Sequence, residues 1–268
     1  MHNGRFHKMH GLGNDFVIVD ARKEHFAPPP AMAAAIADRY KGIGCDQLIV
    51  LTRSRAADVA MRIFNADGSE AEACGNATRC VVALIGRDVT VETVAGLLEG
   101  HAGDLPEVAM GMPSFDWQAI PLAYAVDTSA MPVGYGPLER PMAVNIGNPH
   151  AVFFVGDVNA VDLAALGPEI EHDALFPERV NVNVAAVRGD GGLDLRVWER
   201  GAGLTLACGS GACATAIAAI RKGLATSPVA VHLPGGVLTV DWAEGKPVRM
   251  RGSASYVFSG RTDWSRFG

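Results

Sequence analysis

The sequence lacks any long hydrophobic run and any cluster of basic residues. Its longest apolar runs, of which Ala151–Val155 is one, are far shorter than the roughly 20 residues that a membrane-spanning helix needs. The formal net charge of −6 disfavours a chain that coats nucleic acid. No segment is low in complexity, and 49% of the residues are hydrophobic, as in an ordinary globular protein. We therefore expect a small-molecule partner, no nucleic acid and no membrane.

Cysteine and lysine are both scarce. Five cysteines, an odd number, fit poorly with a complete disulfide framework. The N-terminal segment has no apolar core of the kind that a secretory signal peptide needs, so we expect a cytoplasmic protein with reduced thiols. None of the five lysines has a context typical of a Schiff-base site, which argues against pyridoxal phosphate as a cofactor.

The chain contains an internal repeat. The tripeptide Ala-Cys-Gly occurs at 73–75 and again 134 residues later at 207–209, each time before an apolar stretch. The β-rich segments Val59–Phe64 and Leu193–Trp198 have the same offset. Later segments also follow in the same order. The sequence therefore predicts two homologous halves, which we place at 1–116 and 117–254, with the tail from about 255 to 268 as a candidate for packing back on the first half.

Each half shows the same order of expected elements. Short runs rich in Val, Ile and Phe, separated by Gly, Asn and Pro, predict strands. The segments after each Ala-Cys-Gly are apolar on nearly every side, which is typical of a buried helix. We expect an α/β fold of the α+β type, in which a central buried helix in each half is wrapped by mostly antiparallel strands, with an active site in the cleft between the halves. The expected strands include Phe16–Asp20, Leu48–Leu51 and Ala151–Val155, and the expected helices are Ala31–Arg39, Arg79–Ile85 and Ala212–Ile220.

The repeated cysteines Cys74 and Cys208 allow three interpretations. Buried cysteines are often simple packing residues, and this role suits Cys80, Cys213 and Cys45 better, because Cys74 and Cys208 each precede a glycine at a turn. Metal binding is disfavoured because the spacings do not match zinc knuckles. The third interpretation is acid–base chemistry, since a helix N-terminus lowers the pKa of a thiol toward neutrality and offers backbone N–H groups to a carboxylate.

Two such thiols suit one reaction class in particular. Inversion at a carbon acid needs a base on one face of the carbon and an acid on the opposite face, and two homologous halves can supply one each. Without a cofactor as an electron sink, the reaction depends on exclusion of water and on N–H donors to the developing negative charge.

The motifs resemble those of the diaminopimelate epimerase family, whose members are cofactor-independent isomerases. The two cysteine segments match its two active-site signatures, and four further segments occur in the family's order, so that the resemblance covers nearly the whole chain. One departure is Ala77, where the family commonly has glycine. The matching segments are Lys8–Phe16, Gly42–Gln47, Phe64–Cys80, Gly147–Phe153, Pro177–Asn181 and Glu199–Cys213.

The resemblance implies a role for each matching residue. Cys74 and Cys208 would be the two acid–base thiols, with His150 and Glu199 as polar neighbours that help to set their protonation. Glu199 also belongs to the implied substrate-binding set. The remaining residues of that set are Gly75, Asn76, Gly209 and Ser210 around the reacting carboxylate, Asn14 and Gln47 near the reacting end, and Asn65, Asn148, Asn181 and Arg200 at the far end of the substrate.

The implied reaction is epimerisation of LL-2,6-diaminopimelate to the meso form, on the route to lysine and cell-wall peptide, with no cofactor and no metal. The resemblance also implies a homodimer. Two alternatives stay open. One is a racemase of the same fold that acts on proline, hydroxyproline or histidine, and the other is a non-catalytic protein in which Cys74 and Cys208 form a reversible disulfide.

Overall fold

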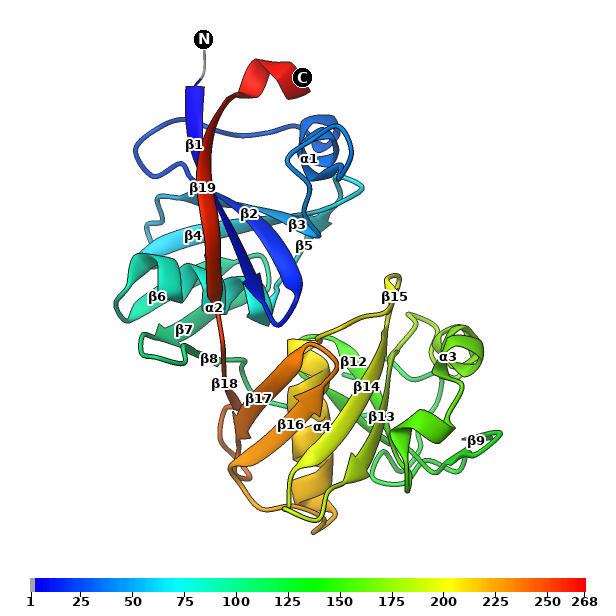
Figure 1. Cartoon of the computed structure of the whole chain (residues 1–268). Coiled ribbons are helices and arrows are strands. Elements are labelled where there is room, and N and C mark those ends of the chain that lie inside the picture. The colour runs from blue at the N-terminus through cyan, green and yellow to red at the C-terminus, as the bar shows by residue number, and fades with distance from the viewer. Residues whose placement is uncertain (1–2) are drawn as a thin grey trace. The chain divides into compact units, whose positions relative to one another are not determined.

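A computed structural model describes residues 3–268 of the chain (Figure 1). The chain divides into two compact units. Unit 1 contains the residues up to Val108 together with Gly252–Gly268, and unit 2 is Ala109–Arg251. The division lies nearer the N-terminus than the boundary at 116 that we expected from the sequence. Among the described residues, no helix is long and apolar enough to cross a membrane.

Unit 1 combines a mixed sheet with a helix at its centre. Strand β2 runs antiparallel to β1 and parallel to β3, β4 is antiparallel to β3, and β6 is parallel to β4 and forms a hairpin with β7. Helix α2 contacts β1, β6, β7 and β19. The elements are β1 (Asn3–Gly11), β2 (Asn14–Asp20), α1 (Pro30–Ala37), β3 (Gln47–Thr52), β4 (Val59–Asn65), β5 (Glu70–Ala71), α2 (Gly75–Ile85), β6 (Val89–Thr93), β7 (Gly96–His101), β8 (Glu107–Ala109), β19 (Ser255–Asp263) and the 3₁₀ helix η2 (Trp264–Phe267).

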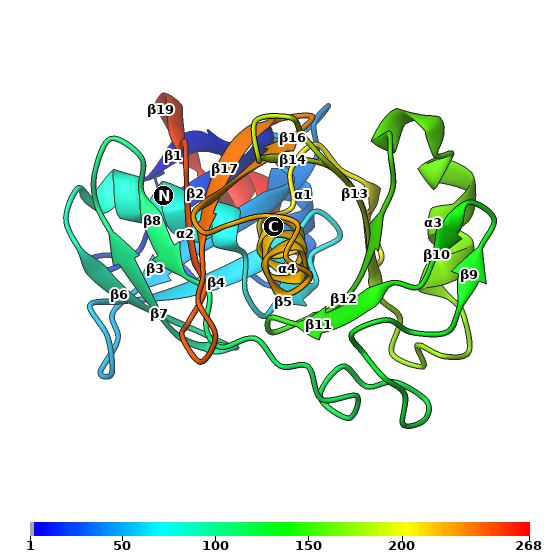
Figure 2. The same ribbon diagram turned by 90° about the horizontal axis from the view of Figure 1, so that it is seen from below.

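Unit 2 repeats this topology and adds elements of its own. The pairs β11–β12, β12–β13, β13–β14 and β14–β16 have the same directions as β1–β2, β2–β3, β3–β4 and β4–β6, and β16–β17 is again a hairpin. Figure 2 looks nearly along helix α4, which the strands of unit 2 surround. The elements are β9 (Gly134–Tyr135), β10 (Leu138–Glu139), β11 (Met142–Asn145), β12 (Pro149–Phe154), the 3₁₀ helix η1 (Val158–Ala160), α3 (Leu163–Glu171), β13 (Asn181–Val187), β14 (Leu193–Glu199), β15 (Gly203–Leu204), α4 (Gly209–Arg221), β16 (Val229–Leu233), β17 (Gly236–Asp241) and β18 (Arg249–Gly252).

The structure confirms the predicted fold class, with one buried helix among strands in each half. Both central helices are longer than predicted, because α2 begins at Gly75 and α4 at Gly209, directly after the repeated cysteines. Glycine and asparagine are weak helix formers, so composition alone places these starts too late. The predicted helix 31–39 ends early, at Ala37, because the backbone of Asp38 leaves the helical conformation, with a ψ of 123°, and its carboxylate accepts the N–H groups of Tyr40 and Lys41.

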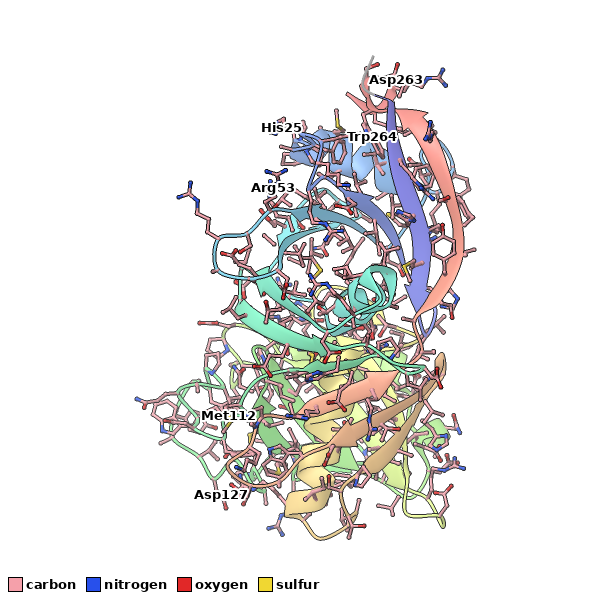
Figure 3. The ribbon with its side chains drawn as sticks, turned by 90° about the vertical axis from the view of Figure 1, so that its left-hand side faces the viewer. His25, Arg53, Met112, Asp127, Asp263 and Trp264 are labelled. Carbon is pink, nitrogen blue, oxygen red and sulfur yellow. The ribbon has the colours of Figure 1, made fainter. Side chains whose placement is uncertain are left out.

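The C-terminal tail belongs to unit 1. Strand β19 pairs antiparallel with β1 over most of its length, and the two run side by side in Figure 1. After it, Trp264 is 5% exposed and lies 4.6 Å from Phe26, measured between ring centroids. A side chain at Gly4 would collide with its indole, since an added Cβ would lie 1.8 Å from Trp264 Nε1. The last residues therefore complete the core of unit 1 (Figure 3).

Helix α3 is attached to β14 by a buried carboxylate. Glu171, which is 3% exposed, accepts hydrogen bonds from Trp198 Nε1 at 2.7 Å and from the backbone N–H of Gly201 at 2.9 Å. Gly167 allows the indole to lie close to the helix, since an added Cβ would be 2.4 Å from Trp198 Cδ2. Glu171 therefore holds the two sides of the turn that contains Glu199 and Arg200.

We expect Glu171→Gln to lower the free energy of unfolding by about 1–3 kcal/mol, because an amide has one acceptor oxygen and cannot serve both N–H groups. Urea unfolding followed by tryptophan fluorescence measures this. Exposed Glu169, two residues earlier, is the matched control, and Glu169→Gln should change stability by no more than about 0.5 kcal/mol. Equal stability of the two variants would contradict the role of Glu171.

Candidate active site

The two repeated cysteines occupy the same position in each half. Cys74 is the N-cap residue of α2 and Cys208 is the N-cap residue of α4, and both have extended backbone conformations. The first N–H groups of each helix, which have no partner within the helix, therefore lie beside a thiol. Gly75 and Gly209 are the first helical residues, so no Cβ covers these backbone groups. This arrangement can hold an anion next to a group that exchanges protons.

In unit 1, Asn14 lies beside the thiol of Cys74, and Asn76 forms a hydrogen bond with Asn14. Asn14 Oδ1 lies 3.9 Å from Cys74 Sγ, and Asn76 Nδ2 donates to the same oxygen at 3.2 Å. Asn14 reaches the helix from the start of β2, after a tight turn in which Leu12 and Gly13 both have positive φ. The structure thus brings together Asn14, Cys74, Gly75 and Asn76, all of which the sequence motifs assign to the reacting end of the substrate.

Gln47 and Asn65 form a second polar pair in unit 1. They are opposite each other on β3 and β4, and Gln47 Nε2 donates to Asn65 Oδ1 at 3.0 Å. Asn65 Nδ2 in turn donates to Ser69 Oγ at 3.0 Å. The two residues, which we had assigned to opposite ends of the substrate, are therefore neighbours.

In unit 2, Cys208 lies among hydrogen-bond donors but is deeply buried. Gly211 donates its N–H to Cys208 Sγ at 3.3 Å, and Ser210 Oγ is 3.6 Å from the sulfur. Burial and then the charge of Glu199 nevertheless raise the pKa of this thiol well above its ordinary value. The lowered pKa that we expected from the helix N-terminus is therefore wrong for Cys208, because loss of solvation outweighs the donors.

A chain of hydrogen bonds extends from Ser210 to a buried histidine. Asn148 Nδ2 donates to Ser210 Oγ at 3.2 Å, and Asn148 Oδ1 is 2.9 Å from His150 Nε2. Burial lowers the pKa of His150 to about 3, so its ring is neutral at neutral pH. Its Nδ1 accepts from Asn183 Nδ2 at 3.0 Å, which places the proton on Nε2, where it is donated to Asn148. His150 therefore orients Asn148 and carries no charge.

The turn after β14 places the other predicted residues. The carboxylate of Glu199 accepts a short hydrogen bond from Thr205 Oγ1. Asn181 Oδ1 accepts the backbone N–H of Arg200 at 2.9 Å, while Asn181 Nδ2 donates to Pro149 O at 2.8 Å. Arg200 Nη1 donates to Glu178 O at 3.0 Å. Asn181 thus links three segments of the chain, and its amide is engaged at both ends.

Two residues of unit 2 form hydrogen bonds with predicted site residues but were missed by the sequence interpretation. Asn183 Nδ2 donates to His150 Nδ1, and Thr205 Oγ1 donates to the carboxylate of Glu199. Asn183 could have been found, because it is a polar residue in the middle of the apolar strand segment 180–186, where a buried amide needs partners. Thr205 lies in a glycine-rich turn with no distinguishing pattern.

A surface pocket of about 400 Å³ lies elsewhere, beside residues 21–27 of unit 1. Figure 3 labels two of its lining residues, His25 and Arg53. None of the predicted site residues lines it. Two of its arginines are already held by carboxylates, since Arg22 pairs with Asp20 and Arg62 with Glu70. The pocket therefore offers fewer groups for catalysis or ligand binding than the two helix N-termini do.

Known structures share the fold. A hydroxyproline epimerase from Agrobacterium vitis aligns with a TM-score of 0.67 at 14% identity, covering 97% of this chain and 92% of that one. A Bacillus anthracis protein of the PhzF phenazine biosynthesis family aligns with a TM-score of 0.69 at 15% identity, covering 98% and 99%. At these identities the likeness concerns the fold alone.

The sequence has much closer relatives. The family model for diaminopimelate epimerase matches residues 6–115 and 142–257. The diaminopimelate epimerase of Rhizorhabdus wittichii is 63% identical over 268 residues, covering 98% of this chain and 97% of that protein. That of Sphingopyxis alaskensis is 62% identical over 265 residues, covering 98% and 99%. These matches confirm the resemblance seen in the motifs, and the chain belongs to the diaminopimelate epimerase family.

Proposed function

We propose that the protein interconverts LL-2,6-diaminopimelate and meso-diaminopimelate without a cofactor, with Cys74 and Cys208 as the two acid–base groups. The observation that carries the proposal is the placement of one cysteine at the N-cap of the buried helix in each homologous half. Membership of the family supports the substrate. The product would serve lysine and cell-wall precursor synthesis.

In the proposed mechanism, one cysteine begins as a thiolate and the other as a thiol. The thiolate removes the proton from Cα on one face, and the electron pair left behind is delocalised into the carboxylate. The thiol then delivers its proton to the opposite face, so that the configuration at Cα is inverted and each sulfur has changed its protonation state. The N–H groups of the first turns of α2 and α4, with Asn76 and Ser210, would stabilise the charge that develops on the carboxylate.

The far end of the substrate distinguishes this proposal from a racemase of proline, hydroxyproline or histidine. A second amino-acid group needs a guanidinium for its carboxylate and amide oxygens for its ammonium. Arg200 is held through its backbone by Asn181 and through Nη1 by Glu178 O, so that its other N–H groups are presented in one orientation. We assign the far end to Arg200 with Asn65, Asn148 and Asn181. A guanidinium and amides placed for a second amino-acid group would have nothing to bind in a site for proline.

We also propose a cytoplasmic location, because the chemistry requires thiols that stay reduced. A homodimer is supported by an exposed apolar run on β19. Tyr256, Val257 and Phe258 are consecutive and 51%, 54% and 46% exposed, so both sides of the strand present apolar side chains. A second copy of the chain would cover them.

Sedimentation velocity should give about twice the chain mass of 28.1 kDa. Phe258→Asp should shift the protein toward the monomer, because it places a charge in the proposed interface. Val237→Asp, at a similarly exposed valine on β17 of unit 2, should leave the mass unchanged. A wild-type protein of monomer mass would contradict the homodimer.

Replacement of either N-cap cysteine should abolish most of the epimerase activity. We expect Cys74→Ser and Cys208→Ser each to lower the rate of meso formation from LL-diaminopimelate by about 10²–10⁴-fold, because a hydroxyl is a far weaker base than a thiolate. The measurement is deuterium incorporation at Cα in D₂O with reduced protein and no added cofactor.

Cys213→Ala is the matched control, because Cys213 is fully buried in the same helix as Cys208. It should retain activity close to wild type. Full activity of either serine variant would refute the two-thiol mechanism. Exchange with proline but none with diaminopimelate would favour the racemase, and no exchange with any amino acid would favour the redox protein.

Glu199 should control the protonation of Cys208. Its negative charge disfavours the thiolate, so Glu199→Gln should lower the thiol pKa and raise the thiolate fraction at a given pH. The pH dependence of Cys208 alkylation by iodoacetamide, in a Cys74→Ala background, measures the shift. Thr205→Val, which removes the hydrogen bond and keeps the charge, should not lower the midpoint. A midpoint that is unchanged in Glu199→Gln would remove Glu199 from this role.

A further inference from the structure

Four charged side chains form a cluster next to the Cys74 site. Arg39 Nη2 donates to Asp15 Oδ1 at 2.7 Å and to Asp46 Oδ1 at 2.6 Å. Lys8 Nζ donates to Asp15 Oδ2 and to the carbonyl of Gly44 in short hydrogen bonds. No residue of this cluster belongs to the set of site residues that the sequence motifs identify.

The two carboxylates of the cluster are fixed in place by each other's backbone. Asp15 N donates to Asp46 Oδ2 at 3.0 Å, and Asp46 N donates to Asp15 Oδ1 at 3.1 Å. Although burial opposes it, hydrogen bonds from Arg39 and Lys8 lower the pKa of Asp15 to about 2. Arg39 therefore bridges the start of β2 and the residue before β3, and the Asp15 carboxylate stays charged at neutral pH.

Asp46 also makes a contact that Asp15 does not share. Asn14 Nδ2 donates to Asp46 Oδ2 at 3.0 Å. A carboxylate can only accept hydrogen bonds, so the amide of Asn14 must turn its nitrogen toward Asp46. Its oxygen is then directed to the opposite side, where Asn76 Nδ2 donates to it at 3.2 Å and Cys74 Sγ lies 3.9 Å away. Asp46 thus determines which end of the Asn14 amide faces the thiol.

The orientation matters because the two ends of an amide have opposite effects on a thiol. An oxygen accepts the S–H of a protonated cysteine and repels a thiolate, whereas a nitrogen donates to the thiolate and stabilises it. At Cys208 both kinds of neighbour occur, because Gly211 N donates to the sulfur while the carboxylate of Glu199 disfavours the thiolate. At Cys74 the oxygen of Asn14 acts in the second way.

We infer that Asp46 is a positioning residue for Cys74: it holds the Asn14 amide with its oxygen toward the sulfur and so favours the protonated thiol, which is the form that delivers a proton. This inference rests on the proposed acid–base function of Cys74. It concerns the balance between thiol and thiolate, which can be measured without turnover.

The test is the pH dependence of Cys74 alkylation by iodoacetamide in a Cys208→Ala background, read from the mass of the peptide that contains Cys74. An asparagine at position 46 can donate as well as accept, so Asp46→Asn allows the Asn14 amide to turn its nitrogen toward the sulfur. The midpoint should fall by about half a pH unit, which makes alkylation at pH 7 about threefold faster.

Asp15→Asn is the matched control, because it also weakens a carboxylate contact to Arg39 but leaves the bond between Asn14 and Asp46. It should leave the midpoint unchanged. Asn14→Ala removes the oxygen and should also lower the midpoint, and adding Asp46→Asn to it should have no further effect, because Asp46 acts through Asn14.

An unchanged midpoint in Asp46→Asn, an equal shift in Asp15→Asn, or an additive shift in the double variant would overturn the inference. If Asp46→Asn does not fold, the alkylation midpoint of Asn14→Ala is the deciding measurement. An unchanged midpoint in that variant would show that the amide oxygen has no influence on the thiol, and this too would overturn the inference. If the alkylation shift appears and no deuterium exchange occurs with diaminopimelate, the proposed function fails and the role of Asp46 stands.

Discussion

Enclosure of one helix by strands in each half is the constraint on which the rest of the structure depends. Helices α2 and α4 are buried along most of their length, so neither can rotate or slide without unpacking its neighbours. The N-terminus of each helix is thereby fixed, and with it the cysteine at the N-cap. Asn14 in one unit and Asn148 in the other reach these fixed points from strand ends, and each meets a polar residue of the first helical turn there.

Much of the fold was predictable because the duplication is visible in the sequence. The offset between the two Ala-Cys-Gly segments also relates β4 to β14 and the first residue of α2 to that of α4. The helix starts were placed too late, since Gly75, Asn76 and Gly209 have low helix propensity and their conformation depends on packing. The hairpin of β9 and β10 in unit 2 lies outside the repeat and had no counterpart in unit 1 from which it could be inferred.

The candidate site, like the fold, was predictable only in part. Residues that belong to short motifs could be identified from the residues around them, and within each unit the structure places these motif residues close to one another. Asp46 and Asn183 act on Asn14 and His150 through hydrogen bonds between segments that lie 32 and 33 residues apart, so these partners cannot be read from a local pattern, although Asn183 stands out as a polar residue in an apolar strand. Thr205 is close to Glu199 in the sequence, but its glycine-rich turn has no distinguishing pattern. The raised pKa of Cys208 was missed for a related reason, because helix position can be read from sequence and the depth of burial cannot.

The pairing of β19 with β1 bears on how the protein is made. Unit 2 is one continuous stretch of chain, so all of its strands have been synthesised before the last residues appear. Unit 1 receives β19 and the indole of Trp264 only from the last segment of the chain. On a ribosome that adds residues from the N-terminus, the second unit can therefore be complete before the first, and β1 lacks the partner strand β19 until residues 255–263 have been made.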